Sequence, residues 1–284
     1  MPNRARWLNA AFLSIVVAAC ACGPSAGSTS DSRPSNAPAA PSRPARWTPS
    51  LGDRFQSQLS GSPDRTIRAS VYDLDVFETT AADVAALHAK GRHVVCYIDA
   101  GSFEKGRPDE HAFPAVVLGA IYVGYPDERW LDIRRLDLLA PIMDARLDLC
   151  KSKAFDAVEP DNIDGWQNTS GFPLSAKDQI AYNTWFARHA HARGLSIALK
   201  NDGDQTAQLL PWFDFAIVED CWRQSLCQRY AAMVAAKKVV FTIEYSDRTS
   251  RAAFRRGVCP KARRAGMIAV MKNRTLDAWR DACP

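Results

Sequence analysis

The amino-acid sequence predicts a single (β/α)8 TIM barrel, and three observations support this fold. Short apolar strands alternate with helical patterns over residues 47–284, and such alternation is typical of a parallel sheet. Most strands are nearly continuous apolar runs bounded by Gly, Pro, Asn or Asp, as expected when helices cover both faces. Eight repeats in this length fit a closed barrel better than an open sheet. The eight predicted strands are Phe55–Leu59, Ser70–Asp75, His93–Ala100, Ala157–Asn162, Ser196–Asn201, Phe215–Asp220, Val239–Tyr245 and Met267–Lys272.

The segments between the strands have helical patterns. Thr80 is a suitable N-cap for the first of them, and Ser175 with Asp178 forms a capping box for the third. Pro141 marks a kink or a restart within the second. The three predicted helices are Ala81–Lys90, Arg135–Lys153 and Ala176–Arg193.

The N-terminal residues have the composition of an export signal. Arg4 and Arg6 precede an apolar stretch that ends in small residues and is too short to span a bilayer as a helix. The stretch closes with Val-Ala-Ala followed by Cys20, which resembles a bacterial lipobox in which the cysteine is acylated. Acylation at Cys22 and a plain secretory signal are the alternatives.

These features predict three parts of the chain. Residues 1–19 are expected to be a lipoprotein signal peptide, and 20–46 a flexible linker rich in Ser, Pro and Ala that buries too little apolar surface to fold. Residues 47–284 are expected to form the folded domain. This domain is expected to lie on the periplasmic or cell-surface side of a membrane, or to be secreted. The membrane is then a partner only through the lipid anchor.

Charge does not indicate a nucleic-acid partner. The formal net charge is +5, which becomes about +3 once Arg4 and Arg6 leave with the signal. No run of Lys or Arg exceeds two residues, so a phosphate-binding stripe is not expected. We expect a monomer.

Six cysteines follow the leader, and export makes disulfide bonds possible. Cys221 and Cys227 have a spacing that suits a local loop, and Cys259 and Cys283 bracket the last segment. Cys96 and Cys150 are the remaining two, and fifteen pairings are possible. Neither C-x-x-C nor H-x-x-x-H occurs, so disulfides are favoured over a metal site and no metal is expected.

Acidic residues gather where the predicted strands end, which is the end at which barrel enzymes place their active sites. Strand side chains alternate between faces, so Glu159 and Asp161 should point the same way, as should Asp73 and Asp75. Lys200 is expected to form an ion pair with Glu159 or Asp161. The residues expected to bind substrate are Asp73, Asp75, Tyr97, Asp99, Glu159, Asn162, Asp164, Lys200, Asp202, Glu244 and Tyr245.

Crowded carboxylates predict glycosidic cleavage. Mutual repulsion raises the pKa of at least one acid, and a protonated acid beside an ionised partner is what this reaction requires. Motifs for a serine nucleophile, a P-loop or a dinucleotide site are absent from residues 47–284. We therefore expect a hydrolase that needs no cofactor.

Seven sequence blocks follow one another in an order that resembles a known family. They are VYDLD at 71–75, CYIDAGSFE at 96–104, RPD at 107–109, ERWLDIR at 128–134, FDAVEPDNIDG at 155–165, LKND at 199–202 and EDC at 219–221. The set resembles the endo-α-1,4-polygalactosaminidase family of glycoside hydrolases, family 114, which has a TIM-barrel fold. The resemblance extends from about Trp47 to the C-terminus.

The resemblance implies endo-hydrolysis of α-1,4-linked galactosamine polymers. It assigns Asp161 as the nucleophile and Glu219 as the acid/base, with exchangeable roles. Asp220 departs from the family pattern, in which an amide is more frequent. The residues themselves support the substrate class, because a carboxylate-lined mouth attracts a cationic amino sugar.

Three alternatives remain open from the sequence. The catalytic pair could join Glu244 to Glu159 or Asp161. A sugar-binding lipoprotein without activity could use the same fold. A metal-dependent deacetylase could use Asp73 and Asp75, although suitable histidines are missing.

Overall fold

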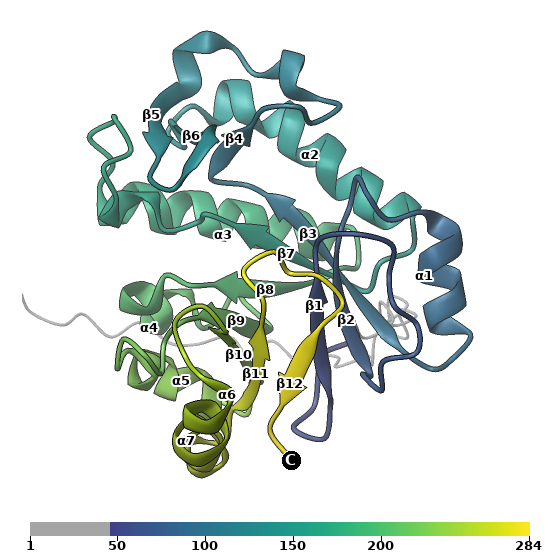
Figure 1. The fold of residues 1–284 in the computed structure, drawn as a ribbon. Coiled ribbons are helices and arrows are strands. Elements are labelled where there is room, and N and C mark those ends of the chain that lie inside the picture. The colour runs from purple at the N-terminus through teal and green to yellow at the C-terminus, as the bar shows by residue number, and fades with distance from the viewer. Residues whose placement is uncertain (1–45) are drawn as a thin grey trace, which may run out of the picture. The chain divides into compact units, whose positions relative to one another are not determined.

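A nine-stranded sheet forms the centre of the computed structural model, which describes residues 46–284; the expected signal peptide, Cys20 and the linker up to residue 45 lie outside the described residues. Its first eight strands are parallel and match the eight predicted strands (Figure 1). In sheet order they are β1 (Phe55–Gln58), β2 (Val71–Asp75), β3 (His93–Asp99), β7 (Ala157–Asp161), β8 (Ser196–Lys200), β9 (Phe215–Glu219), β10 (Val240–Tyr245) and β11 (Ile268–Lys272). The predicted barrel is confirmed.

The barrel closes through a strand that the sequence did not reveal. β12 (Arg280–Ala282) pairs antiparallel with β11, and the residues before it reach back to β1. The backbone N–H of Leu59 donates to the carbonyl of Leu276 at 2.9 Å, and the Gln56 amide donates to the carbonyl of Ala278 at 3.1 Å. Isolated hydrogen bonds therefore join the last segment to the first strand at this seam.

Alternation along the strands divides the barrel lumen into an apolar lower part and a charged upper part. On β7, Ala157 lies in the lumen cluster, and Glu159 and Asp161 follow on the same face. On β9, Phe215 and Ile217 precede Glu219 in the same way. Phe55 stacks on Phe241 across the lower lumen, with 4.3 Å between the ring centroids, so this part of the barrel is packed. The acids of the strands therefore lie together at one rim, above the packed part.

Helices cover the outside of the barrel. They are α1 (Ala81–His88), α2 (Leu136–Ser152), α3 (Ala176–Ala192), α4 (Thr206–Leu209), α5 (Ala231–Ala235), α6 (Arg251–Ala253) and α7 (Cys259–Ala265). The capping box of Ser175 and Asp178 forms as predicted, and Thr80 forms a second one with Asp83. Pro141 lies inside α2, which continues through it as one helix. 3₁₀ turns occupy 110–112, 115–117, 165–167, 203–205 and 227–230, and one wider π-helical turn occupies 254–258.

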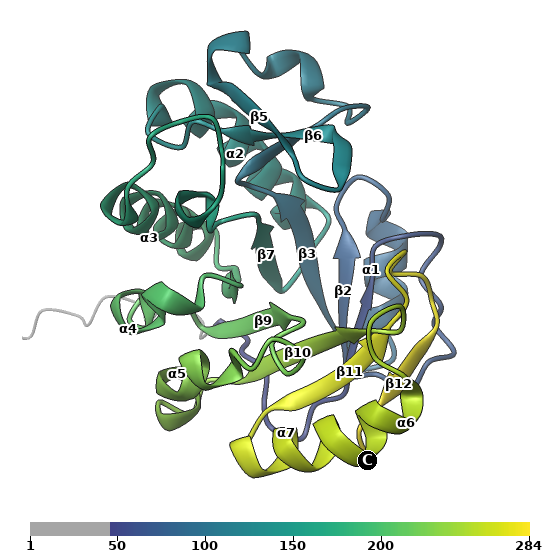
Figure 2. The same ribbon diagram turned by 60° about the vertical axis from the view of Figure 1, so that its left-hand side comes forward.

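A small antiparallel sheet stands on the connection between β3 and α2. Its order is β4-β6-β5, formed by β4 (Ser102–Glu104), β5 (Leu118–Tyr122) and β6 (Tyr125–Leu131). The ribbon views show β5 and β6 beyond the end of β3, at the rim where the central strands end (Figure 2). No strand is expected here from the sequence. The small sheet brings a second set of side chains to the acidic rim.

Three disulfide bonds use the six cysteines. Cys221–Cys227 and Cys259–Cys283 join the pairs that their spacing favoured, and Cys96–Cys150 ties β3 to α2. These bonds indicate an extracytoplasmic, oxidising environment for the domain. Among residues 46–284, no helix is long and apolar enough to cross a bilayer.

Candidate active site

The ammonium group of Lys200 lies at the centre of the acidic rim. Its Nζ is 2.6 Å from Glu159 Oε1, 3.2 Å from Asp161 Oδ1 and 3.9 Å from Glu219 Oε2. The predicted ion pair therefore forms with both acids of β7, which face the same way as expected. β8 carries the lysine between β7 and β9, so three neighbouring strands place these groups together.

Asp161 and Glu219 lie close to each other, around the same ammonium group. Because both carboxylates lie within 4 Å of the same nitrogen, their nearest oxygens are at most about 7 Å apart. Each acid also accepts a hydrogen bond from a tyrosine: Tyr97 donates to Asp161 Oδ2 at 2.9 Å, and Tyr245 donates to Glu219 Oε1 in a close contact. The two acids are thus held in similar ways on either side of Lys200.

The electrostatic environments of the two acids differ. Burial raises the pKa of Glu219, Lys200 opposes this shift, and the charge of Asp161 adds to it. Burial would lower the pKa of Lys200, but the charges of Asp161, Glu159 and Glu219 outweigh it and hold this pKa well above its usual value. Lys200 is therefore held as a cation, and Glu219 keeps its proton to a higher pH than an ordinary glutamic acid.

A buried pair of carboxyl groups supports this centre from below. Ser57 donates to Asp73 Oδ2 at 2.9 Å, while Asp73 Oδ1 and Glu159 Oε2 have no other hydrogen-bond partner. Burial and the charge of Glu159 raise the pKa of Asp73 well above its usual value. A proton on Asp73, donated to Glu159, satisfies both oxygens, so Asp73 belongs to the floor of the site.

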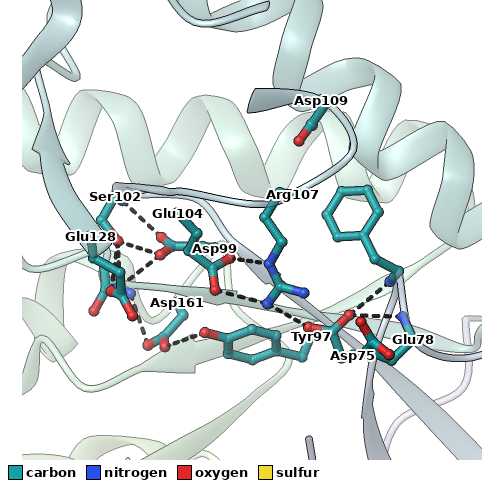
Figure 3. A network of polar contacts seen from close by, with 12 residues as sticks. Asp75, Glu78, Tyr97, Asp99, Ser102, Glu104, Arg107, Asp109, Glu128 and Asp161 are labelled. Atoms are coloured by element: carbon teal, nitrogen blue, oxygen red, sulfur yellow. Dashed lines mark hydrogen bonds and ion pairs between the residues drawn. The ribbon is translucent and has the colours of Figure 1, made fainter. Parts of the chain in front are cut away.

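Several other predicted residues hold loops in place. Asp75 pairs with Arg107 at 2.7 Å, and Arg107 also binds Glu104 (Figure 3). Asp99 accepts hydrogen bonds from Ser102 and, at 3.1 Å, from the Asn162 amide.

Asp202 and Glu244 are likewise engaged with the protein. Asp202 accepts from the Trp166 indole at 3.1 Å, and burial raises its pKa to about 8. Glu244 accepts from the backbone N–H of Trp222 at 2.8 Å, on the face of β10 opposite to Tyr245. Glu244 therefore does not face Lys200, and the alternative pairing with Glu159 or Asp161 has no geometric support.

The strand ends turn sharply to open the rim. Asn162, Asn201, Asp202 and Asp220 follow β7, β8 and β9, and all have positive φ angles between 49° and 60°. Asn and Asp tolerate this left-handed conformation better than most residues. Gly101 passes so close to the Asn162 carbonyl that a Cβ would lie 1.7 Å from its oxygen, so only glycine fits beside this turn.

Four residues near the acids had been given no role in the sequence analysis. Glu128, on β6, lies beside Asp161; burial and the charges of Glu104 and Asp161 raise its pKa to about 7. Arg274 stacks on the Tyr245 ring at 3.7 Å. Tyr122 and Tyr125 also experience the charges of Asp161 and Glu219. The acidic and aromatic pattern around Gly124 was the available signal for this hairpin.

A cavity of about 390 Å³ opens beside Glu219. Asp164, Asn201, Asp220 and Arg274 contribute to its walls. Burial and the charge of Asp161 raise the pKa of Asp164 to about 6. A larger cavity of about 480 Å³, between β1, α7 and the C-terminal residues, contains none of the acids around Lys200. The smaller, polar cavity is therefore the one that belongs to the site.

Within residues 46–284, no group of three or more His, Cys, Asp or Glu residues is arranged to hold a metal ion.

Comparison with known proteins relates this site to carbohydrate chemistry. The model of glycoside-hydrolase family GH114 matches residues 36–284. A crystal structure of Aspergillus fumigatus Ega3 in complex with galactosamine is 34% identical, with a TM-score of 0.80 over 85% of this chain and 99% of that chain. The glycoside hydrolase domain of PelA from Pseudomonas aeruginosa is 15% identical, with a TM-score of 0.67 over 81% and 98% of the chains, and shares the fold. A comparison with curated proteins found no match.

Proposed function

Because the chain belongs to glycoside-hydrolase family GH114, we propose that it cleaves α-1,4-linked galactosamine-containing polysaccharide internally, with Asp161 and Glu219 as its catalytic pair. The observation that carries this assignment is the position of both carboxylates within 4 Å of Lys200 Nζ. They form a pair with one shared counter-ion at the rim where barrel enzymes bind substrate.

The different surroundings of the two acids support different roles. Asp161 accepts hydrogen bonds from Tyr97 and from the N–H of Asn162 and faces the Lys200 ammonium, all of which stabilise a negative charge. Glu219 has a raised pKa, which suits a proton donor.

In the proposed reaction, Glu219 gives its proton to the glycosidic oxygen as the bond from that oxygen to the anomeric carbon breaks. The Asp161 carboxylate forms a bond to the same carbon. Glu219 then takes a proton from water, whose oxygen displaces Asp161 and regenerates both groups. The interchange of these two roles between the acids remains the alternative.

An amine on the substrate suits the charge of this rim. The structure of Ega3 contains galactosamine, and galactosamine with a free amine is a cation. Glu128 lies beside Asp161 and is partly exposed, with a pKa of about 7 that a neighbouring cation would lower. Asp75, Asp99 and Asp202 are buried and held by the protein. Glu128 accepts a hydrogen bond from Ser102 at 3.2 Å but is partly exposed, so we propose Glu128 as the contact for the amine.

The activity is tested with two polymers that differ only in acetylation. An α-1,4-linked galactosamine polymer should release oligosaccharides of mixed length, detected by reducing-end assay and mass spectrometry. The fully N-acetylated polymer should react at least about tenfold more slowly, because a neutral amide loses a charge-assisted hydrogen bond.

Glu128→Gln should reduce the ratio between the rates on the free-amine polymer and on the N-acetylated polymer. Glu78→Gln, which changes an exposed acid, is the matched control and should keep the wild-type ratio. Failure to release oligosaccharides from either polymer would contradict the activity and favour sugar binding. Equal rates on both polymers would contradict only the recognition of the amine and would leave the proposed activity standing.

We also propose that the chain is exported and anchored through an acylated Cys20. The lipobox-like sequence before Cys20 and the three disulfide bonds of the domain support this location. In a bacterial host, labelled palmitate should be incorporated into the wild-type chain and should be absent from Cys20→Ser. Cys22→Ser is the matched control and should keep the label; label retained in Cys20→Ser would contradict the assignment.

A further inference from the structure

A hairpin formed by β5 and β6 stands at the rim of the site (Figure 2). β5 and β6 are joined by Val123 and Gly124, and Gly124 has a φ of 93° that suits the turn. Arg129 on β6 donates to the carbonyls of Leu118 at 3.0 Å and Gly119 at 2.6 Å, which fastens one strand to the other.

The base of the hairpin is also tied to the loop that follows β7. The N–H of Ala120 donates to the Ser170 carbonyl at 2.8 Å. A Cβ at Gly119 would lie 2.1 Å from the same oxygen, so glycine allows the two backbones to meet. The hairpin is therefore anchored on the loop of a strand that carries catalytic residues.

Aromatic side chains form a continuous ladder along this hairpin. Buried Trp130 stacks on Tyr122 with ring centroids 4.7 Å apart, and Tyr122 meets the edge of Tyr125 at 5.4 Å. Trp130 packs against Gly165, where a Cβ would lie 3.2 Å from the indole. Tyr125 is 46% exposed at the outer end of the ladder, so a supported aromatic face is presented to solvent.

The hairpin stands at the rim that carries both catalytic acids (Figure 2). Its strand β6 places Glu128 beside Asp161 (Figure 3). In addition to burial, the charges of Asp161 and Glu219 both raise the pKa of Tyr122 and of Tyr125. The ladder is therefore next to the space in which the scissile bond must lie.

We propose that Tyr125, supported by Tyr122 and Trp130, stacks on a galacto-configured sugar ring beside the bond that is cleaved. In a galacto-configured pyranose, the axial hydroxyl at carbon 4 leaves several C–H groups together on the opposite face. Such an apolar face packs on an aromatic ring, whereas the gluco configuration spreads its hydroxyls around the edge. Tyr125 is thus a specificity-determining residue.

This inference rests on the proposed function. It also adds a reason for internal cleavage, because a polymer held along the hairpin can bind without presenting a chain end.

The test compares Tyr125→Ala with Tyr125→Phe and with Val123→Ala, whose side chain is 88% exposed at the tip of the same hairpin. On the galactosamine polymer, Tyr125→Ala should raise KM by roughly five- to tenfold and change kcat little. Tyr125→Phe keeps the ring and should recover most of the loss, and Val123→Ala should keep the wild-type KM.

Calorimetric binding in a Glu219→Gln background supplies a readout that a merely structural role would not move. Galactosamine oligosaccharides should bind more tightly than glucosamine oligosaccharides, and Tyr125→Ala should reduce this ratio. A KM within twofold of wild type together with an unchanged ratio would overturn the inference. If the wild-type protein itself releases no oligosaccharides, the proposed function fails instead.

Discussion

Asp161→Asn and Glu219→Gln should each lower kcat on the galactosamine polymer by roughly 10²–10⁴-fold while leaving the fold intact. Both changes keep the shape of the side chain and remove its ability to carry a charge or exchange a proton. Initial rates of reducing-end release measure the loss, and circular dichroism and thermal unfolding report the fold. Asp148→Asn, at an exposed acid of α2, is the isosteric control and should retain full activity.

The two variants should separate the two roles. An aryl galactosaminide with a good leaving group does not need protonation, so Glu219→Gln should keep much of its activity on that substrate. Asp161→Asn should lose activity on both substrates, because the nucleophile is needed in each case. The reverse pattern would exchange the roles, and full polymer activity in both variants would refute the site.

The pH profile provides a further check on Glu219. A raised pKa keeps this carboxyl protonated above its ordinary value of 4.5, so activity is present below the raised pKa and falls as pH increases through it. The alkaline limb of kcat/KM should therefore lie above pH 4.5 on the polymer. With the activated aryl substrate, the kcat/KM profile of Glu219→Gln should lack the alkaline limb. If the alkaline limb persists in this variant, it arises from the titration of another group.

Lys200→Met should lower the free energy of unfolding by about 3–5 kcal/mol and abolish polymer cleavage. Lys200 is 3% exposed and is the shared counter-ion of Glu159, Asp161 and Glu219. Without it, buried carboxylates repel one another and Asp161 loses the charge that favours its ionised form. Urea unfolding and reducing-end assays measure the two effects.

A double variant separates stability from catalysis. Glu159→Gln combined with Lys200→Met removes one buried charge along with its partner and should recover part of the stability, but not the activity. Lys261→Met, at an exposed lysine of α7, is the matched control. If Lys200→Met unfolds with the same urea midpoint as the wild-type protein, the ammonium group does not hold the acids together.

The local sequence was sufficient to predict the barrel strands because each one has a short apolar run, and the two-residue period determines which side chains share a face. This period correctly placed Glu159 beside Asp161 and placed Lys200 within reach of both. It could not distinguish the two faces of β10, where Glu244 binds Trp222 and Tyr245 points to Glu219. That difference depends on which face the completed barrel encloses.

The small sheet was missed for a different reason. β5 and β6 form a partly exposed two-stranded unit with an irregular register, so neither strand has the strong apolar pattern of a barrel strand. The unit is stabilised largely by contacts made elsewhere, such as Ala120 with Ser170. The acidic and aromatic pattern around Gly124 was therefore the one local signal for Glu128, Tyr122 and Tyr125, and it does not predict a strand.

Residue types and spacings along the chain predicted the order of the strands and the accumulation of acids at their ends, and they carried the family resemblance. They favoured two of the three disulfide bonds without excluding other pairings. Each of these features depends on residues or spacings that can be compared directly. Three features depend on the folded barrel: Lys200 joins three acids, Asp73 lies beneath them, and the β5–β6 hairpin stands at the same rim. Distances between residues far apart in the chain, and the pKa shifts that follow, depend on how the closed barrel excludes water and brings charges together.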